Sequence, residues 1–246
     1  KSSMAPSEQI LWVIDRMLAD EFDILDTGEI FFDDGPYKQP HWREVAEELE
    51  GRLKSFNRTD SRHYSRQALL NQLLDAYELS GWQNKVIPLM EKEVDACKNY
   101  DDLVKKLLEA GEKEKAKYWC KLGFERTIKD LPGIASRLQN ILRGMAFDEN
   151  RHDLVASYLA QDFFHRPSMH TYVELIDAAE KAGCRSAVRE AAVRYLETGI
   201  RPDIENSVGK DSVWPLPEPE VIRPVSDKRT SYETFPDLNV LIDIAI

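Results

Sequence analysis

The residues of this sequence that come nearest to a reactive set are His165, His170 and Asp162. Two histidines and one carboxylate are the ligands of a facial metal triad, which binds iron in many oxygenases. Pro167 lies between the histidines, at the expected start of a helix, so the two rings are not expected to face each other. We therefore predict no metal site at this position.

A second candidate for metal binding lies in residues 23–34, where four aspartates surround Gly28. Placing Gly28 at position 6 of a calcium-binding EF-hand loop puts Leu25 at position 3 and Asp34 at position 12. The loop requires an oxygen ligand at the first of these positions and a bidentate glutamate at the second. The segment is therefore predicted to form an acidic loop without calcium.

The cysteines and the catalytic signatures also argue against chemistry. Cys97, Cys120 and Cys184 are odd in number and widely spaced, which favours buried reduced thiols over disulfides or a zinc site. No hydrolase signature, phosphate-binding glycine loop or metalloprotease motif is found in the sequence. We predict a protein that is not an enzyme, has no cofactor and, because no apolar leader is visible, is cytoplasmic.

The distribution of charge limits the partners. The 246 residues carry 44 acidic and 33 basic side chains, for a net charge of -11. The excess acid lies in the flanks, since residues 61–198 contain 21 acids and 21 bases. A neutral middle with mixed signs has no basic stripe for phosphates, and no apolar run is long enough to cross a membrane. The sequence thus predicts no direct nucleic-acid binding and no membrane association.

A repeat becomes visible when Gly81, Gly111 and Gly183 are aligned. A fourth unit fits with Glu149 in the glycine position, which separates the turns by 30, 38 and 34 residues. Apolar residues lie 11, 8 and 7 positions before each turn and 5 and 9 positions after it. Before the turns these residues are Leu70, Leu73, Leu74, Tyr100, Leu103, Val104, Leu138, Ile141, Leu142, Tyr172, Leu175 and Ile176. After the turns they are Val86, Met90, Ala116, Cys120, Leu154, Tyr158, Val188 and Ala192.

This spacing predicts helical hairpins. Glycine adopts the left-handed conformation that ends a first helix, and smaller residues after the turn let the second helix approach closely. One hairpin cannot bury both of its faces, so consecutive hairpins must stack. The fold class expected is all-α, an α–α superhelix of antiparallel hairpins.

Two family resemblances extend this prediction. The unit around Gly111 resembles the tetratricopeptide repeat through the spacing of Tyr100, Leu103, Leu107, Gly111, Ala116 and Cys120. That resemblance implies a right-handed solenoid with a binding groove on its concave face. Residues 62–70, 118–134 and 189–199 resemble the helical region that follows the zinc finger in bacterial SWIM zinc-finger proteins. That second resemblance implies a zinc-binding module upstream in a longer chain.

Three regions are expected along the chain. Residues 1–60 should form capping helices with the acidic loop, and residues 61–198 four irregular hairpin repeats. Residues 199–246 should begin with a proline-rich extended segment and lead into a truncated helix that starts near Pro236. The proline-rich segment is expected to lie along the solenoid and bury Trp214, Val221 and Ile222, with a free linker and an SH3-type ligand as alternatives.

The expected function is a non-catalytic scaffold for protein–protein interaction, as a fragment of a larger intracellular protein. In the tetratricopeptide register the groove that binds a protein or peptide partner is lined by Asn71, Asp75, Lys105, Arg143 and Asp177. The alternative is the scaffold region of a nucleic-acid-associated SWIM zinc-finger protein. A third possibility is a catalytic or regulatory role that requires a further domain.

Overall fold

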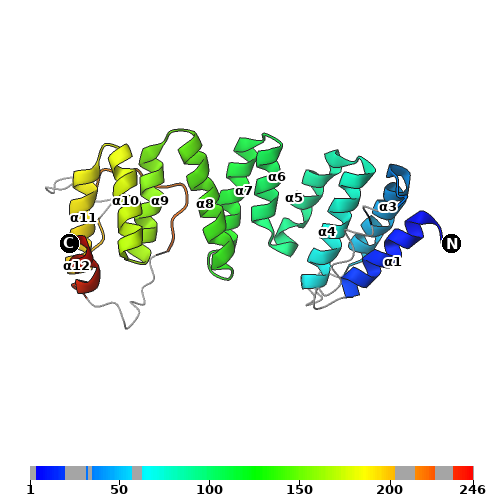
Figure 1. Cartoon of the computed structure of the whole chain (residues 1–246), viewed down its shortest axis with the longest axis horizontal. Coiled ribbons are helices and arrows are strands. Elements are labelled where there is room, and N and C mark those ends of the chain that lie inside the picture. Colours follow the sequence, from blue (N-terminus) through cyan, green and yellow to red (C-terminus); the bar gives the residue numbers. More distant parts are fainter. Residues whose placement is uncertain are drawn as a thin grey trace. The chain divides into compact units, whose positions relative to one another are not determined.

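The computed structural model describes residues 4–19, 32, 35–56, 63–202, 214–224 and 235–245. Within these residues the regular secondary structure is entirely helical, with no strand (Figure 1). Successive helices are joined mostly by short turns, and most pack against a neighbour in chain order. The prediction of an all-α helical-repeat fold is confirmed, and the handedness of the superhelix stays a prediction.

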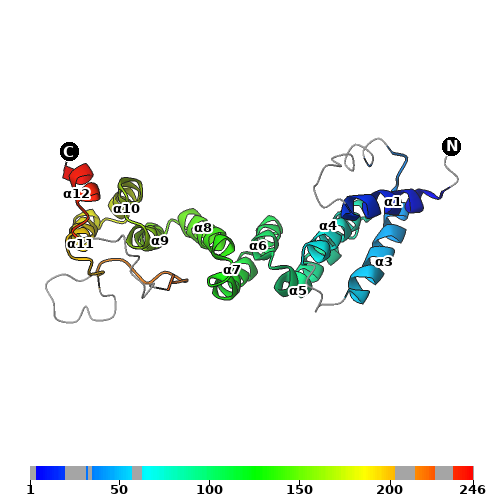
Figure 2. The ribbon, with the colours of Figure 1, turned by 90° about the horizontal axis from the view of Figure 1, so that it is seen from below.

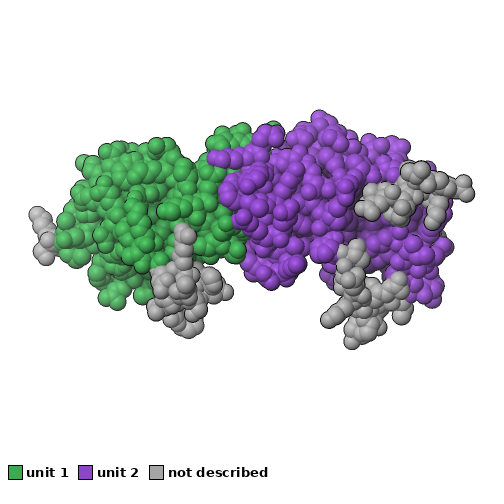
Figure 3. Space-filling view, turned by 180° about the vertical axis from the view of Figure 1, so that it is seen from behind, with its two compact units in different colours: residues 1–113 green, residues 114–246 purple. Residues whose placement is uncertain are grey.

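The chain forms two compact units, residues 1–113 and 114–246, which Figure 3 shows in different colours. Unit 1 contains α1 (Pro6–Ala19), α3 (Gln39–Ser55), α4 (His63–Ser80), the 3-10 turn η1 (Gln83–Lys85), α5 (Val86–Cys97) and α6 (Tyr100–Glu109). Unit 2 contains α7 (Lys113–Thr127), α8 (Pro132–Asp148), α9 (His152–His165), α10 (Met169–Lys181), α11 (Arg185–Thr198) and α12 (Leu238–Ala245).

Helix α3 packs closely against α4, which lies on the other side of the boundary predicted at residue 60. Helix α1 packs on both. The apolar residues of α3 recur every three or four positions, as a helix with one buried face requires. The buried ones are Trp42, Val45, Ala46, Leu49 and Leu53. The acidic segment 23–34 lies outside the described residues, apart from Phe32.

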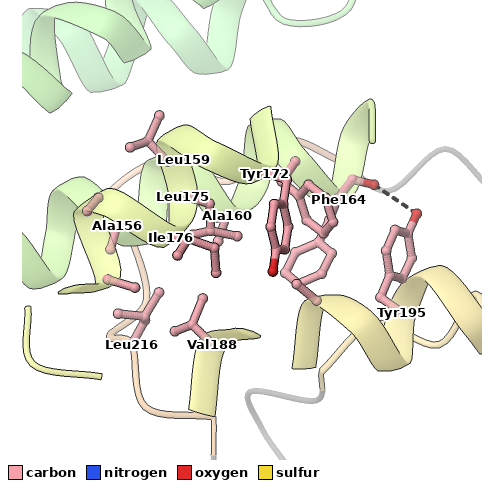
Figure 4. Close-up of a cluster of buried hydrophobic side chains, with 14 of the residues drawn as sticks. Ala156, Leu159, Ala160, Phe164, Tyr172, Leu175, Ile176, Val188, Tyr195 and Leu216 are labelled. Carbon is pink, nitrogen blue, oxygen red and sulfur yellow. Dashed lines mark hydrogen bonds between the residues drawn. The ribbon is translucent and has the colours of Figure 1, made fainter. Parts of the chain in front are cut away.

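The core of unit 2 is an aromatic cluster at the centre of the α9, α10 and α11 packing (Figure 4). Phe163 is fully buried, and its ring lies 6.1 Å from the rings of both Tyr172 and Tyr195. The hydroxyl of Tyr195 donates a 3.1 Å hydrogen bond to the carbonyl oxygen of Phe164. Because that donor lies on α11 and the acceptor on α9, the bond joins two helices that are not neighbours in the chain.

Helix α12 docks on the end of α11 through one aromatic residue. Phe235 lies 5.4 Å from Tyr195, measured between ring centroids, and its ring covers Gly199. The backbone N–H of Asp237 donates to the carbonyl of Leu196 at 2.8 Å. The predicted terminal helix is therefore present, and it adds Val240 to the unit 2 core.

Four turns share one hydrogen-bonding pattern and reveal the repeat directly. In each, the residue after the left-handed position donates its N–H five residues back, as in the Schellman motif. The left-handed residues are Gly81, Gly111, Asn150 and Gly183, with φ between 59° and 81°. The donor–acceptor pairs are Trp82–Tyr77, Glu112–Leu107, Arg151–Ala146 and Cys184–Ala179.

The assignment of Glu149 to the glycine position is wrong by one residue. Glu149 has φ of -82° at the helix end, whereas Asn150 has φ of 59°. Asparagine tolerates this conformation better than other non-glycine residues, because its short side chain can hydrogen-bond locally. An alignment on glycines does not reveal this turn, because its left-handed residue is an asparagine.

The buried positions predicted from the repeat are largely confirmed. All are buried except Leu74, Ile141 and Leu154, which are half-buried. Two of the three exceptions belong to the unit in which the turn was misplaced.

Candidate functional site

The five predicted groove residues lie on the first helices of the hairpins. Asn71 and Asp75 are on α4, Lys105 on α6, Arg143 on α8 and Asp177 on α10. All are exposed except Arg143, which is half-buried. The first three belong to unit 1 and the other two to unit 2, so their common groove stays a prediction.

The structure shows a different binding surface, on which an extended segment of the chain is already held. Residues 214–224, here called the strap, contain no helix or strand and run beside α9 (Figures 1 and 2). Leu216 and Val221 are buried and Trp214 is half-buried. The expectation that this segment lies along the helices is correct. Its detail is wrong for Ile222, which is 52% exposed.

Helix α9 holds the strap by its main chain. Ser157 Oγ donates to the carbonyl of Pro217 at 2.7 Å, and Gln161 Nε2 donates to the carbonyl of Val221 at 2.8 Å. Gln161 Oε1 also accepts from the N–H of Arg223 at 2.8 Å. Ser157 and Gln161 are four residues apart and therefore share one helix face. This face of α9 therefore contacts the main chain of the strap.

Two lysines of α7 bind the half-buried acid of the strap, Glu220. Lys117 and Lys121, again four residues apart, both form salt bridges with Glu220, the second at 2.7 Å. Burial raises the pKa of Glu220, but the hydrogen bonds and charges of the two lysines outweigh it and hold the pKa below its ordinary value. Glu220 is thus bound as a carboxylate.

The last strap contact is a network around Arg223. Its Nε donates to Gln139 Oε1 at 2.5 Å, and its terminal nitrogen lies 3.3 Å from Asp162 Oδ1. Arg143 lies 3.4 Å from the other oxygen of Asp162. Burial raises the pKa of Asp162, while Arg223 and Arg143 oppose that shift. The predicted groove residue Arg143 therefore shares a carboxylate with the strap.

The strap does not fill the space beneath it. Trp214 packs on Phe164 at 5.8 Å between ring centroids. A cavity of about 270 Å³ nevertheless remains between α9 and the strap. Its mainly apolar lining includes Phe164, Trp214, Pro217, Pro219, Ile222 and Pro224.

The residues considered for metal binding and catalysis have other partners. Asp162 is held by two arginines, and His170 lies 3.5 Å from Glu174. No group of three His, Cys, Asp or Glu in the described part of the chain is placed to hold a metal ion. Burial raises the pKa of Cys97 to about 11 and that of Cys120 to about 12, so both are thiols at neutral pH. The arrangement on α7–α9 is suited to binding.

Sequence reasoning found the strap but missed the residues that hold it. Ser157 with Gln161, and Lys117 with Lys121, are polar pairs at i and i+4 on helices. Such pairs are common on solvated helix faces, so the spacing alone does not single them out. Nothing local to them points to residues 214–224.

The fold and this surface define an all-α helical-repeat protein that binds an extended segment of its own chain. Comparison with protein-family models, curated proteins and solved structures finds no match to the chain. Among the described helices, none combines the length and apolar character needed to cross a membrane.

Proposed function

We propose that this chain is a non-catalytic scaffold that binds an extended segment of a partner protein. The observation that carries the proposal is the strap. Ser157 and Gln161 bind the main chain of the strap, and Lys117 and Lys121 bind the carboxylate of Glu220. Helices that hold one extended segment in this way have the donors, acceptors and charges to hold another.

The composition supports a protein partner. Residues 61–198 balance 21 acids with 21 bases, so a phosphate backbone would meet no basic stripe. The three free thiols support an intracellular, cytoplasmic location for the scaffold. Salt-dependent binding of the chain to DNA or RNA would contradict this choice and favour a nucleic-acid-associated role.

The test is selection of short unstructured peptides from a display library on the full chain. Enriched peptides should bind the wild type and lose affinity for a variant of the predicted groove, N71A/D75A in unit 1 or D177A in unit 2. The matched control is E190A/R194A, which removes an exposed ion pair on α11 away from these positions. It should bind as the wild type does.

Two results separate the parts of the proposal. If the enriched peptides bound all variants equally, the first-helix groove would not be their binding site. The scaffold function would still stand. A library that yields no binder to the full chain would contradict the scaffold function itself.

A further inference from the structure

The strap is attached to its helices as a ligand is. Within the described residues, no backbone–backbone hydrogen bond involves residues 214–224. The polar contacts of the strap described above run to side chains of α7, α8 and α9. The pocket of about 270 Å³ beside the strap is partly open to solvent and is lined by α9, by the strap and by Arg201 and Pro202, so apolar surface next to the strap stays uncovered. The strap is therefore an imperfectly fitting occupant of this surface.

Building on the scaffold function above, we propose that this surface, formed by Lys117, Lys121, Gln139, Ser157, Gln161 and Asp162, is a peptide-binding site that the strap occupies in cis. Its partner is a proline-rich segment of another protein with the chemistry of the strap. That segment has an aliphatic anchor, an acid four residues later, a second aliphatic residue beside the acid, and an arginine two residues beyond.

Each element of that pattern has a counterpart in the structure. The aliphatic anchors correspond to Leu216 and Val221, which are buried. The acid corresponds to Glu220, which lies between the two lysines of α7. The arginine corresponds to Arg223, whose charge is matched by Asp162. Prolines suit the remaining positions, because Ser157 and Gln161 donate to carbonyls, which proline retains, and the N–H that Gln161 accepts from belongs to the arginine position. Proline also pre-orders an extended chain.

The cavity indicates how a partner would displace the strap. A tethered segment competes at an effective concentration of about millimolar, so the partner must bind more tightly than the strap does. A larger apolar side chain that fills the space beside Phe164 would supply that difference, because it buries apolar surface that the strap leaves open. Binding to the wild type is thus expected to be weak for the strap sequence itself.

The experiment uses the full chain and a labelled synthetic peptide with the sequence of residues 214–224. In the variant L216D/V221D the two anchors of the strap are charged, while all six residues of the binding surface are kept. Fluorescence anisotropy should show peptide affinity at least about tenfold higher for this variant than for the wild type. E190A/R194A should bind as weakly as the wild type.

A charge swap tests recognition without relying on that variant to fold. The chain K117E/K121E repels its own Glu220, so it should bind the peptide carrying Glu220→Lys and not the native peptide. Equal binding of both peptides, or of neither to a chain with intact helical circular dichroism, would overturn the proposal. The library result would then still decide the scaffold function separately.

The source of the segment is settled by the oligomeric state. The wild-type chain should be a monomer in light scattering at all concentrations tested. A concentration-dependent dimer that the peptide dissociates would mean that the site takes the strap of a second copy. That outcome would overturn the assignment to a different partner protein.

Discussion

In each unit an arginine forms a salt bridge between the two helices of a hairpin, but only the salt bridge of unit 1 is buried. In unit 1, Arg66 of α4 and Glu93 of α5 are 6% and 3% exposed, and Arg66 also lies over the ring of Phe56. In unit 2, Arg143 of α8 and Asp162 of α9 are 30% and 24% exposed. The other carboxylate oxygen of Asp162 forms a salt bridge with Arg223 of the strap. The buried ion pair of unit 1 joins only the two helices of its hairpin. The partly exposed pair of unit 2 also offers a carboxylate oxygen to a segment from elsewhere in the chain.

The largest effect is expected from isosteric neutralisation of the two acids. Glu93→Gln leaves the charge of Arg66 buried and uncompensated, and should lower the free energy of unfolding by about 3–5 kcal/mol. Asp162→Asn should cost about 1 kcal/mol, because both of its arginines reach solvent. Urea denaturation with hydrogen exchange on α4, α5, α8 and α9 measures both. Equal losses of unfolding free energy in the two variants would show that the two salt bridges do not differ in their contribution to stability.

A control for the buried pair replaces both partners. The variant R66M/E93L removes both charges and keeps apolar volume, so it should regain most of the stability lost in Glu93→Gln. A loss as large as that of the single variant would mean that packing, rather than the buried charge, causes the effect.

The second effect compares two glycines of similar backbone conformation. Gly111 has φ of 77° and open space around its Cα, so Gly111→Ala should cost about 1–2 kcal/mol from the backbone alone. Gly199 has φ of 71°, and an added Cβ would lie 2.7 Å from the ring of Phe235. Gly199→Ala should cost about 1–3 kcal/mol more and increase hydrogen exchange in α12. Identical costs would show that α12 is not held through Phe235.

A smaller effect concerns the pH dependence of the strap. The folded-state pKa of Glu220 is below its ordinary 4.5, so its contribution is present above that value and is lost as pH falls through the lowered pKa. The difference in unfolding free energy between wild type and Glu220→Gln should shrink toward zero on acidification. A difference that stays constant with pH would mean that the lysines do not bind the carboxylate.

The smallest effect tests the register of the third repeat. Asn150→Gly should stabilise the chain by about 0.5 kcal/mol, because glycine adopts φ of 59° without steric cost. The matched variant Glu149→Gly should destabilise it slightly, since that residue is at the helix end with ordinary φ. If Asn150→Gly instead lowered the melting temperature and Glu149→Gly raised it, the turn position would belong to Glu149, as the sequence alignment predicts.

The hairpins could be predicted from the sequence because their signals are local. Gly81, Gly111 and Gly183 mark turns whose hydrogen bonds reach only five residues back, and apolar periodicity defines the buried faces. The one misplaced turn, at Asn150, carries a weaker form of the same signal. The sequence also predicts α1, as a capping helix within residues 1–60, and α12, as a terminal helix that starts near Pro236.

The surface that holds the strap could not be predicted in this way. Ser157 and Gln161 meet residues 60 positions away, and Arg223 meets Gln139 from 84 positions away. The sequence indicated that the proline-rich segment would be buried, but not which helices would bury it. Arg66 and Glu93 are likewise ordinary charged residues in the sequence, and only the packing of α4 on α5 reveals their pairing.

Residue types and short spacings therefore account for the helices, the turns and the choice of an all-α repeat, since these depend on interactions within a few residues. The packing of distant segments accounts for the surface of unit 2 that holds the strap. It places two lysines of α7, together with a glutamine and an aspartate of α9, along a single extended segment. Their hydrogen bonds and charges gain a function only when burial brings them to a common partner.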